Sequence, residues 1–346
     1  MTEPAPRYNS AIQRAKGLLE LGAALYDTSL SYRRTRSGSP APQINSRLGT
    51  QLSLRLDARE GAAPAEDGGI PLSFGVDGHR ANLMAVAEKT LSLLWINPAA
   101  AVALAVKGCP PFPGPQPLRA IASFPSWDAA VLAVHESTGI TAIEQIRERR
   151  YPLRVSTRDP VAPPFDEEAT MFAVNTLIGA AGFSFDDIRA WGGSVSTVPR
   201  PSYPDRAEAV RSGKIDAIFD EGVLSWGQFA IAHGFRILSV EGEARRRVEA
   251  AGYDLVTLTQ SRIPGLAAPV QGIDFCGWPM VVHAEMDEDV VWALCEALEA
   301  RRLAIPTDNY RPLDLSGLCS NGAETPLGAP LHPAAERFYR ERGYRH

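Results

Sequence analysis

The sequence has few cysteines and no long apolar run, and each shortage argues against a class of protein. The four cysteines, Cys109, Cys276, Cys295 and Cys319, show no CxxC pair and no histidines at metal-ligand spacing. We therefore expect no metal site, and we interpret the cysteines as buried or half-buried free thiols, with one disulfide as the alternative. No stretch approaches 18 apolar residues, so we predict no membrane span.

Lysine is also scarce, since only four of the 35 basic residues are lysines. This leaves few candidates for Schiff-base chemistry, and Lys214, in a predicted exposed turn, is a poor one. A net charge of −5 without a basic stripe argues against nucleic-acid binding. The sequence contains no HExxH, GxSxG, P-loop or GxGxxG motif, so metalloprotease, α/β-hydrolase, nucleotide and dinucleotide sites lack support and we expect no cofactor.

The N-terminal segment lacks both a basic n-region and an A-x-A cleavage site. Its apolar residues instead repeat at helical spacing, which predicts an amphipathic helix over 11–33, followed by a polar loop over 34–47. As the sequence is written we expect a cytoplasmic protein. We would expect a periplasmic one if this N-terminus were truncated or misannotated.

The most informative stretch is 207–234. A helical pattern stops at Gly213, a short apolar run over 215–219 predicts a buried parallel strand, and a second helix follows at about 224–233. Asp220 and Glu221 come directly after the strand. Because open α/β sheets bind ligands beyond the carboxyl ends of their strands, these carboxylates are the first site candidates. Adjacent residues point in different directions, so we expect one of them to face a ligand.

Similar patterns of helices and strands fill the rest of the 346 residues, which are enough for two domains. A proline-rich surface segment is expected over 109–117, and the residues 188–191 lead into a predicted loop over 192–203. The other predicted strands are 48–56, 91–96, 118–124, 129–135, 153–156, 236–240 and several within 253–283, and the other predicted helices are 81–89, 99–106, 142–149, 167–181, 245–251, 287–302 and 334–342.

Several segments, in order, resemble the TAXI family of solute-binding proteins that serve TRAP transporters. The most specific is 330-PLHPAAERFYRERG-343, and the others include 77-DGHRANL-83, 139-GITAIEQI-146, 167-EEAT-170 and 213-GKIDAIF-219. The resemblance covers roughly residues 48–343. It implies an α/β, two-lobed type II periplasmic-binding-protein-like fold, in which each lobe is a mostly parallel sheet flanked by helices and a hinge joins the lobes.

On this resemblance, residues 48–125 plus 241–346 form one lobe, residues 126–240 form the other, and residues 1–47 precede both. Two features depart from the family pattern. The glycine-rich Gly-Thr-Gly-Gly loop has no visible counterpart, and His79 replaces the serine of the Gly-Gly-Ser helix start. TRAP membrane components are implied partners only if the chain is exported.

Candidate ligand-binding residues lie at helix starts and strand ends. Backbone N–H groups at helix N-termini bind anions, and two such starts are predicted at 78–82 and 168–170. Tryptophans near strand ends favour an aromatic or otherwise apolar-bodied ligand. The full candidate set is Gly78, His79, Asn82, Trp95, Asn97, Trp127, Ser156, Thr157, Arg158, Glu168, Thr170, Asp220 and Glu221.

Two functional hypotheses follow from these residues. The first is a protein that binds a small carboxylate, with an aromatic body as one option, between two lobes. The alternative is a cytoplasmic decarboxylase, isomerase or hydrolase for a carboxylated substrate, with His79, Asp220 and Glu221 as acid–base candidates. A third option is a cytoplasmic sensor or adaptor whose N-terminal helix docks a partner, but the sequence offers no effector domain for it. Binding comes first because the matching pattern is long and no catalytic motif is present.

Overall fold

The structure is a computed structural model that describes residues 46–48, 53–56, 72–75, 79–91, 93–159, 169–302 and 314–346. The chain forms two compact units. Unit 1 comprises the described residues up to Gly108, Gly114–Trp127 and Cys276–His346, and unit 2 comprises Cys109–Pro113 and Asp128–Phe275. The predicted helix at 11–33, and the loop after it up to residue 45, lie outside the described residues.

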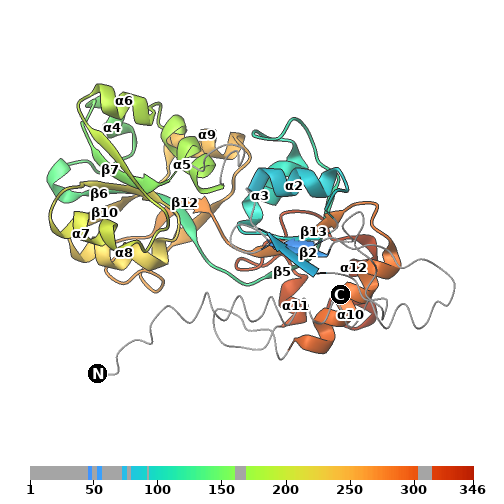
Figure 1. The fold of residues 1–346 in the computed structure, drawn as a ribbon. Coiled ribbons are helices and arrows are strands. Elements are labelled where there is room, and N and C mark those ends of the chain that lie inside the picture. The colour runs from blue at the N-terminus through green and yellow to red at the C-terminus, as the bar shows by residue number, and fades with distance from the viewer. Residues whose placement is uncertain are drawn as a thin grey trace. The chain divides into compact units, whose positions relative to one another are not determined.

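A four-stranded sheet lies at the centre of unit 1 (Figure 1). Its order is β1 (Ser46–Leu48), β4 (Leu93–Trp95), β13 (Trp278–His283) and β5 (Leu118–Phe124). β1 pairs in parallel with β4, whereas β13 runs antiparallel to both β4 and β5. β2 (Ser53–Leu56) and β3 (Leu72–Gly75) form a separate antiparallel pair. The strand predicted over 48–56 thus includes β2 and shares only Leu48 with β1.

The helices described in unit 1 are α2 (His79–Ala87), α3 (Ala99–Lys107), α10 (Glu288–Arg301), α11 (Leu315–Leu318) and α12 (Pro333–Glu341). α3 consists largely of small apolar residues and ends at Gly108, whose φ of 72° is left-handed. A Cβ at Gly108 would lie 2.4 Å from the backbone nitrogen of Pro115. Only glycine therefore fits this helix end.

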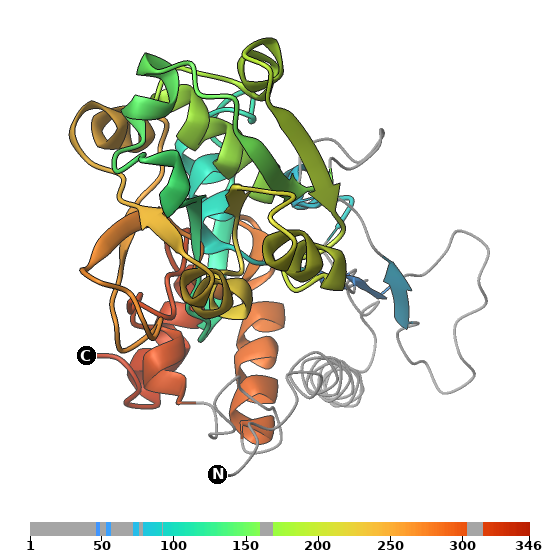
Figure 2. The same ribbon diagram turned by 90° about the vertical axis from the view of Figure 1, so that its left-hand side faces the viewer.

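Aromatic side chains hold α10 and α12 together, and Figure 2 shows the two helices side by side. Trp292 meets Phe338 edge to face with 5.0 Å between ring centroids, and Phe338 and Tyr339 are fully buried. Arg337 also pairs with Glu288 at 2.9 Å across the two helices. Such exposed ion pairs add little stability, so burial of the aromatic rings is the main attraction.

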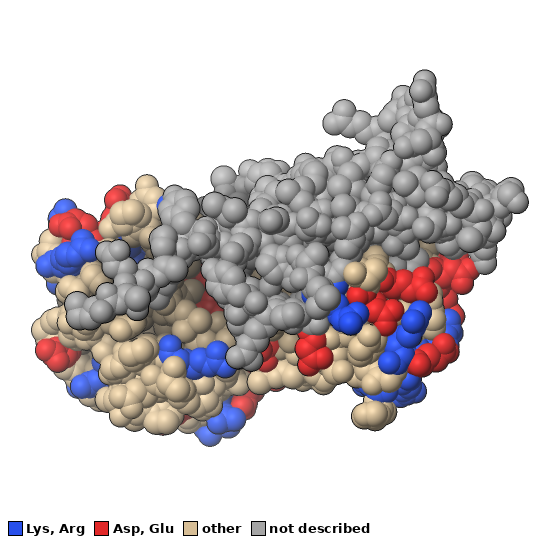
Figure 3. All heavy atoms as spheres, turned by 90° about the horizontal axis from the view of Figure 1, so that it is seen from below, with Lys and Arg blue, Asp and Glu red and all other residues tan. Residues whose placement is uncertain are grey.

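The described surface carries charges of both signs. On the face drawn in Figure 3, positive and negative side chains are interspersed. Among the described residues, no helix has the length and apolar character needed to cross a membrane. The four cysteines are free thiols, of which Cys109 is half-buried and the others are buried, as predicted.

Unit 2 is built on a seven-stranded mixed sheet. Its main path is β11 (Leu255–Leu258), β12 (Val270–Asp274), β6 (Ala129–His135), β9 (Ala217–Asp220), β7 (Arg154–Arg158) and β8 (Ser194–Val198), and β10 (Phe235–Leu238) also pairs with β6. β7 runs parallel to β8 and β9, whereas the other pairs are antiparallel.

Helices cover both faces of this sheet. In Figure 1, α5 (Ala169–Ala180) and α6 (Phe185–Ala190) lie on one side of the strands, and α7 (Pro204–Arg211) and α8 (Val223–Ala232) lie on the other. The remaining helical elements of unit 2 are η1 (Glu136–Thr138), α4 (Glu144–Glu148) and α9 (Gly242–Ala250). The strands supply the core, in which all residues of 129–134 are fully buried.

The predicted α/β class is confirmed, with a sheet flanked by helices in each unit, but the sheets are mixed instead of mostly parallel. The reason is that β6 enters beside β9 in the opposite direction. Unit 2 also continues to Phe275, beyond the predicted boundary at 240, because α9, β11 and β12 pack with it. β8 falls in a predicted loop, since an edge strand of mostly exposed Ser, Thr and Val has no apolar run.

Burial at the centre of this sheet gives a first prediction. Leu132 is fully buried and pairs with Phe219 of β9 on one side and Leu238 of β10 on the other. Leu132→Ala should lower the free energy of unfolding by about 2–5 kcal/mol, because it removes apolar contacts and leaves a cavity. Arg236→Ala, at an exposed position of β10, should stay within about 0.5 kcal/mol. Urea denaturation of both variants measures this, and equal losses would contradict it.

Candidate functional site

One edge of the unit 2 sheet collects charged side chains because of how its strands are paired. β7, β8 and β9 are parallel, so their carboxyl ends meet at the same edge. β6 is antiparallel to β9, with Val131 opposite Asp220, so the start of β6 lies at that edge too. The pairing therefore brings Arg158, the last residue of β7, together with Asp220 and with Asp128, which precedes β6.

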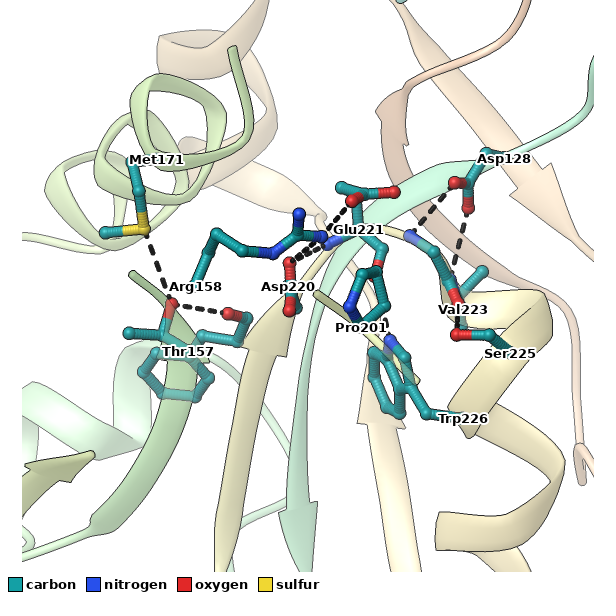
Figure 4. A network of polar contacts seen from close by, with 12 residues as sticks. Asp128, Thr157, Arg158, Met171, Pro201, Asp220, Glu221, Val223, Ser225 and Trp226 are labelled. Carbon is teal, nitrogen blue, oxygen red and sulfur yellow. Dashed lines mark hydrogen bonds and ion pairs between the residues drawn. The ribbon is translucent and has the colours of Figure 1, made fainter. Parts of the chain in front are cut away.

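Arg158 is the centre of the charged cluster (Figure 4). Its Nη2 lies 3.3 Å from Asp220 Oδ1 and also forms an ion pair with Glu221 Oε1. The Arg158 side chain is 8% exposed. The two carboxylates that follow β9 therefore both contact one largely buried guanidinium, whereas we expected only one of them to face the site.

Arg206, in the first turn of α7, holds Asp220 from the other side. Its Nη2 lies 2.6 Å from Asp220 Oδ2, its Nε donates to Ser156 Oγ at 3.0 Å, and its Nη1 donates to the Pro201 carbonyl at 3.1 Å. Burial lowers the pKa of Arg206, and the charge of Asp220 opposes that shift. Asp220, fully buried, is thus bound by two arginines and by the Glu221 backbone N–H at 2.8 Å.

Asp128 caps helix α8 from a neighbouring strand. Its carboxylate accepts from the Gly222 N–H at 2.9 Å and the Val223 N–H at 3.1 Å, as Figure 4 shows. A carboxylate at a helix N-terminus satisfies free N–H groups and is favoured by the helix dipole. Gly222 has a φ of 68°, and a Cβ there would lie 2.5 Å from Pro201 Cγ, so glycine is needed at this turn.

Asp128 and Glu221 form a carboxyl pair, and in Figure 4 Glu221 lies between Arg158 and Asp128. Burial raises the pKa of Asp128 well above its ordinary value, and the negative charge and hydrogen bond of Glu221 raise it further. Burial also raises the pKa of Glu221, against the lowering effect of Arg158. Two carboxylates have no proton to donate to each other, so a hydrogen bond between them forms only when one of them is protonated, and burial moves the pKa of both groups in that direction.

Two further contacts fix the ends of the strands. Thr157 Oγ1 donates to the Phe219 carbonyl at 2.7 Å, which ties β7 to β9 next to the arginines. Trp226 Nε1 donates to the Glu221 carbonyl at 2.8 Å, which holds the turn before α8. The backbone around Arg158 and Glu221 is thereby fixed, and their side chains are 8% and 15% exposed.

The chemistry of this cluster is ionic recognition and proton exchange. The described residues contain no group of three or more His, Cys, Asp or Glu side chains arranged to hold a metal ion. Here Asp220 and Glu221 bind arginines instead. A guanidinium that already contacts carboxylates has the planar donor geometry that suits the carboxylate of a ligand.

The structure brings five of the predicted site residues together in unit 2: Ser156, Thr157, Arg158, Asp220 and Glu221. Thr170 is buried in the first turn of α5. Glu168 and Gly78 lie outside the described residues. His79 is the first residue of α2, close to the helix start predicted at 78–82, but its side chain also lies outside the described residues.

The other predicted site residues belong to unit 1. Trp95 donates from Nε1 to the Trp278 carbonyl at 2.8 Å, and Asn97 donates to the Gly277 carbonyl at 2.8 Å. Asn82 is fully buried in α2, and Trp127 is the last residue of its segment of unit 1. Their part in ligand binding stays a prediction.

Sequence reasoning missed Asp128 and Arg206. Asp128 precedes a strand, and only the antiparallel pairing of β6 with β9 carries it to the site. Arg206 lies just before the helical pattern predicted from residue 207, and nothing in its spacing distinguishes it from the many other arginines. The feature that could have identified Arg206 is its position in the first turn of a helix that follows a strand of the sheet. A side chain at such a position points back over the ends of the strands.

The chain is similar to several solved structures, among them solute-binding proteins. No family model matches the chain. Matching solved structures include XAC2383 from Xanthomonas citri bound to chloride ion, at 14% identity over 76% of this chain and 84% of that chain, with a TM-score of 0.36. An ancestral arginine-binding protein bound to arginine matches at 10% identity over 63% and 69%, with a TM-score of 0.29. A TctC solute-binding protein from Polaromonas matches at 13% identity over 60% and 62%, with a TM-score of 0.31.

The buried ion pairs give a second prediction. Arg206→Met should lower the free energy of unfolding by about 3–5 kcal/mol, because it leaves the buried Asp220 carboxylate with one arginine in place of two. Arg211→Met on the same helix removes an exposed pair with Glu208 and should cost about 1 kcal/mol or less. Chemical denaturation compares the two variants. A similar, small loss for both would show that Asp220 does not need Arg206.

The carboxyl pair gives a prediction about pH. The raised pKa of Asp128 means that the folded chain keeps a proton that the unfolded chain releases near pH 4. The stability linked to this proton is present below that pH and is lost as the pH rises through the raised value. Asp128→Asn, which mimics the protonated form, should therefore become more stable relative to the wild type between pH 5 and pH 8. Thermal unfolding across this range measures the difference.

Asp186→Asn controls for the loss of one negative charge at an exposed position of the same unit. A stability difference between Asp128→Asn and the wild type that stays constant or falls with rising pH would contradict the assignment of the proton.

Proposed function

We propose that this protein binds a small carboxylate, and that Arg158 recognises the carboxylate group. The observation that carries the proposal is that Arg158 already holds a carboxylate, that of Glu221, at the surface end of a buried ion network. Its position at the carboxyl end of β7 matches the place where open α/β sheets bind ligands. The motif resemblance to TAXI solute-binding proteins points to the same class of function.

The network supports binding because it orients Arg158 before any ligand arrives. Asp220 holds Arg158 Nη2, and Arg206 and the Glu221 N–H hold Asp220 in turn. A guanidinium fixed in this way loses little conformational freedom on binding, which favours affinity.

Aromatic ligands are included in the proposal on the basis of the tryptophans near strand ends. If the chain is exported, TRAP membrane components would be its partners.

The test begins with native mass spectrometry of the freshly purified protein, to identify any bound molecule. Thermal shift with benzoate, phenylacetate and formate, each beside its neutral amide, then measures whether the carboxylate group matters. We expect carboxylates to raise the unfolding temperature and the amides to leave it unchanged. Equal shifts with acid and amide, or no shift with any carboxylate, would contradict the proposal.

Arg158→Lys should weaken carboxylate binding at least tenfold, because lysine keeps the charge but loses the planar donor fork. Arg154→Lys is the matched control, since Arg154 lies at the opposite end of the same strand, where it pairs with Asp216 at 2.9 Å. The control should bind like the wild type. Titration calorimetry of both variants with the best carboxylate gives the comparison.

The carboxyl pair favours a second candidate, acid–base catalysis on a carboxylated substrate. A carboxyl group whose pKa is raised well above its ordinary value, as burial raises that of Asp128, can serve as a general acid, and the side chain of Glu221, the other member of the pair, is 15% exposed. Incubation of any co-purified ligand with excess protein separates the two functions. An unchanged mass supports binding, and a new product mass supports an enzyme.

A further inference from the structure

We propose that Glu221 occupies the place of the ligand carboxylate on Arg158, and that a monoanionic ligand displaces it with the uptake of one proton by the Asp128–Glu221 pair. This inference rests on the proposed function and makes it more specific. It names Glu221 as the residue that determines specificity, and weak acids with a single negative charge as the class of ligand.

The contacts of Glu221 define what must change when a ligand binds. Arg158 of β7 holds one of its carboxyl oxygens, Asp128 in front of β6 shares a hydrogen bond with it, and Asp220 of β9 adds a negative charge beside it. Arg206 of α7 adds a positive charge near the same group. Glu221 therefore has a second partner, Asp128, to which its side chain can turn when it leaves Arg158.

The rest of the cluster should stay in place during this exchange. Arg158 remains bound to Asp220, and Asp220 remains bound to Arg206. The Glu221 backbone is fixed through its N–H to Asp220 and its carbonyl to Trp226. The Glu221 side chain, which is 15% exposed against 8% for Arg158 and none for Asp220, is the part of these ion pairs that can move away from the guanidinium.

The net charge of the cluster requires that it takes up a proton when a monoanionic ligand binds. Two arginines face three carboxyl groups, Asp128, Asp220 and Glu221, so the cluster has no net charge when one of these carboxyl groups carries a proton. An added monoanion would leave the buried cluster with one negative charge, which is costly in a medium of low polarity. A proton from solvent on the second carboxyl of the pair restores neutrality. A zwitterion would need no proton, and a dianion would need a second one that the cluster has no place for.

Titration calorimetry with benzoate and formate, in buffers of different ionisation enthalpy, measures the number of protons taken up. We expect about one proton per anion bound to the wild type at pH 7, and an affinity that rises about tenfold for each unit of pH decrease above the apparent pKa of the pair. Phenylalanine, a zwitterion with a similar ring, should bind without proton uptake if it binds at all.

The variants separate competition from proton exchange. Glu221→Gln removes the internal competitor and should bind benzoate at least tenfold more tightly at pH 7. Asp128→Asn combined with Glu221→Gln leaves two arginines against Asp220 alone, so it should bind tightly and take up no proton. Glu208→Gln, an exposed glutamate of the same unit, is the control and should behave like the wild type. Intrinsic tryptophan fluorescence checks that each variant is folded.

The outcomes distinguish this inference from the proposed function. If the carboxylates bind the wild type without proton uptake, and no more tightly to Glu221→Gln, the inference is overturned and the binding function stands. If neither benzoate nor formate binds to the wild type, to Glu221→Gln or to the double variant, both are overturned. Tighter binding by the variants together with loss of proton uptake supports both.

Discussion

The Asp220 carboxylate, enclosed between two arginines, is the constraint on which the candidate site depends. Moving an ion out of water costs several kcal/mol even in a real protein interior, and the cost is offset only when every oxygen is bound. Asp220 Oδ1 meets this condition through the Glu221 N–H at 2.8 Å and Arg158 at 3.3 Å, whereas Oδ2 lies 2.6 Å from Arg206 Nη2 in an ion pair whose angle does not make a hydrogen bond. One consequence is that Arg158 cannot leave without exposing a buried charge, so the residue that we propose recognises a ligand is fixed by the same contacts that stabilise the unit.

The direction of β6 relative to β9 determines where Asp128, on the other side of the site, lies. Had β6 been parallel to β9, its start would lie at the opposite edge of the sheet, far from Asp220. Because it is antiparallel, Asp128 reaches the start of α8 and accepts the N–H groups of Gly222 and Val223. The helix N-terminus, which in other α/β proteins is open to an anionic ligand, is here occupied by a residue of the chain. In the proposed function, anion binding therefore falls to Arg158.

Local patterns in the sequence were sufficient for part of this arrangement. The apolar runs at 118–124 and 129–135 became β5 and β6 at the predicted residues, and the rule that ligand groups follow buried strands selected Asp220 and Glu221. Asp128 and Arg206 depend on which strands are neighbours and in which direction they run, and this is decided by contacts far apart in sequence. β8 was missed for a different reason, since an exposed edge strand needs no apolar pattern to be held by hydrogen bonds to β7.

The binding and enzymatic hypotheses use the same proton and differ in where it goes. In a binding site the proton that enters with the ligand only has to balance the charge of the ligand, so it can stay on the Asp128–Glu221 pair for as long as the ligand is bound. In an enzyme it must reach an atom of the substrate, and Asp128, turned toward the N–H groups of α8, is held away from any such path. Glu221 would have to deliver it while leaving Arg158, which the substrate needs for its own carboxylate. Displacement and proton delivery by one side chain would thus have to occur together, whereas binding requires displacement alone.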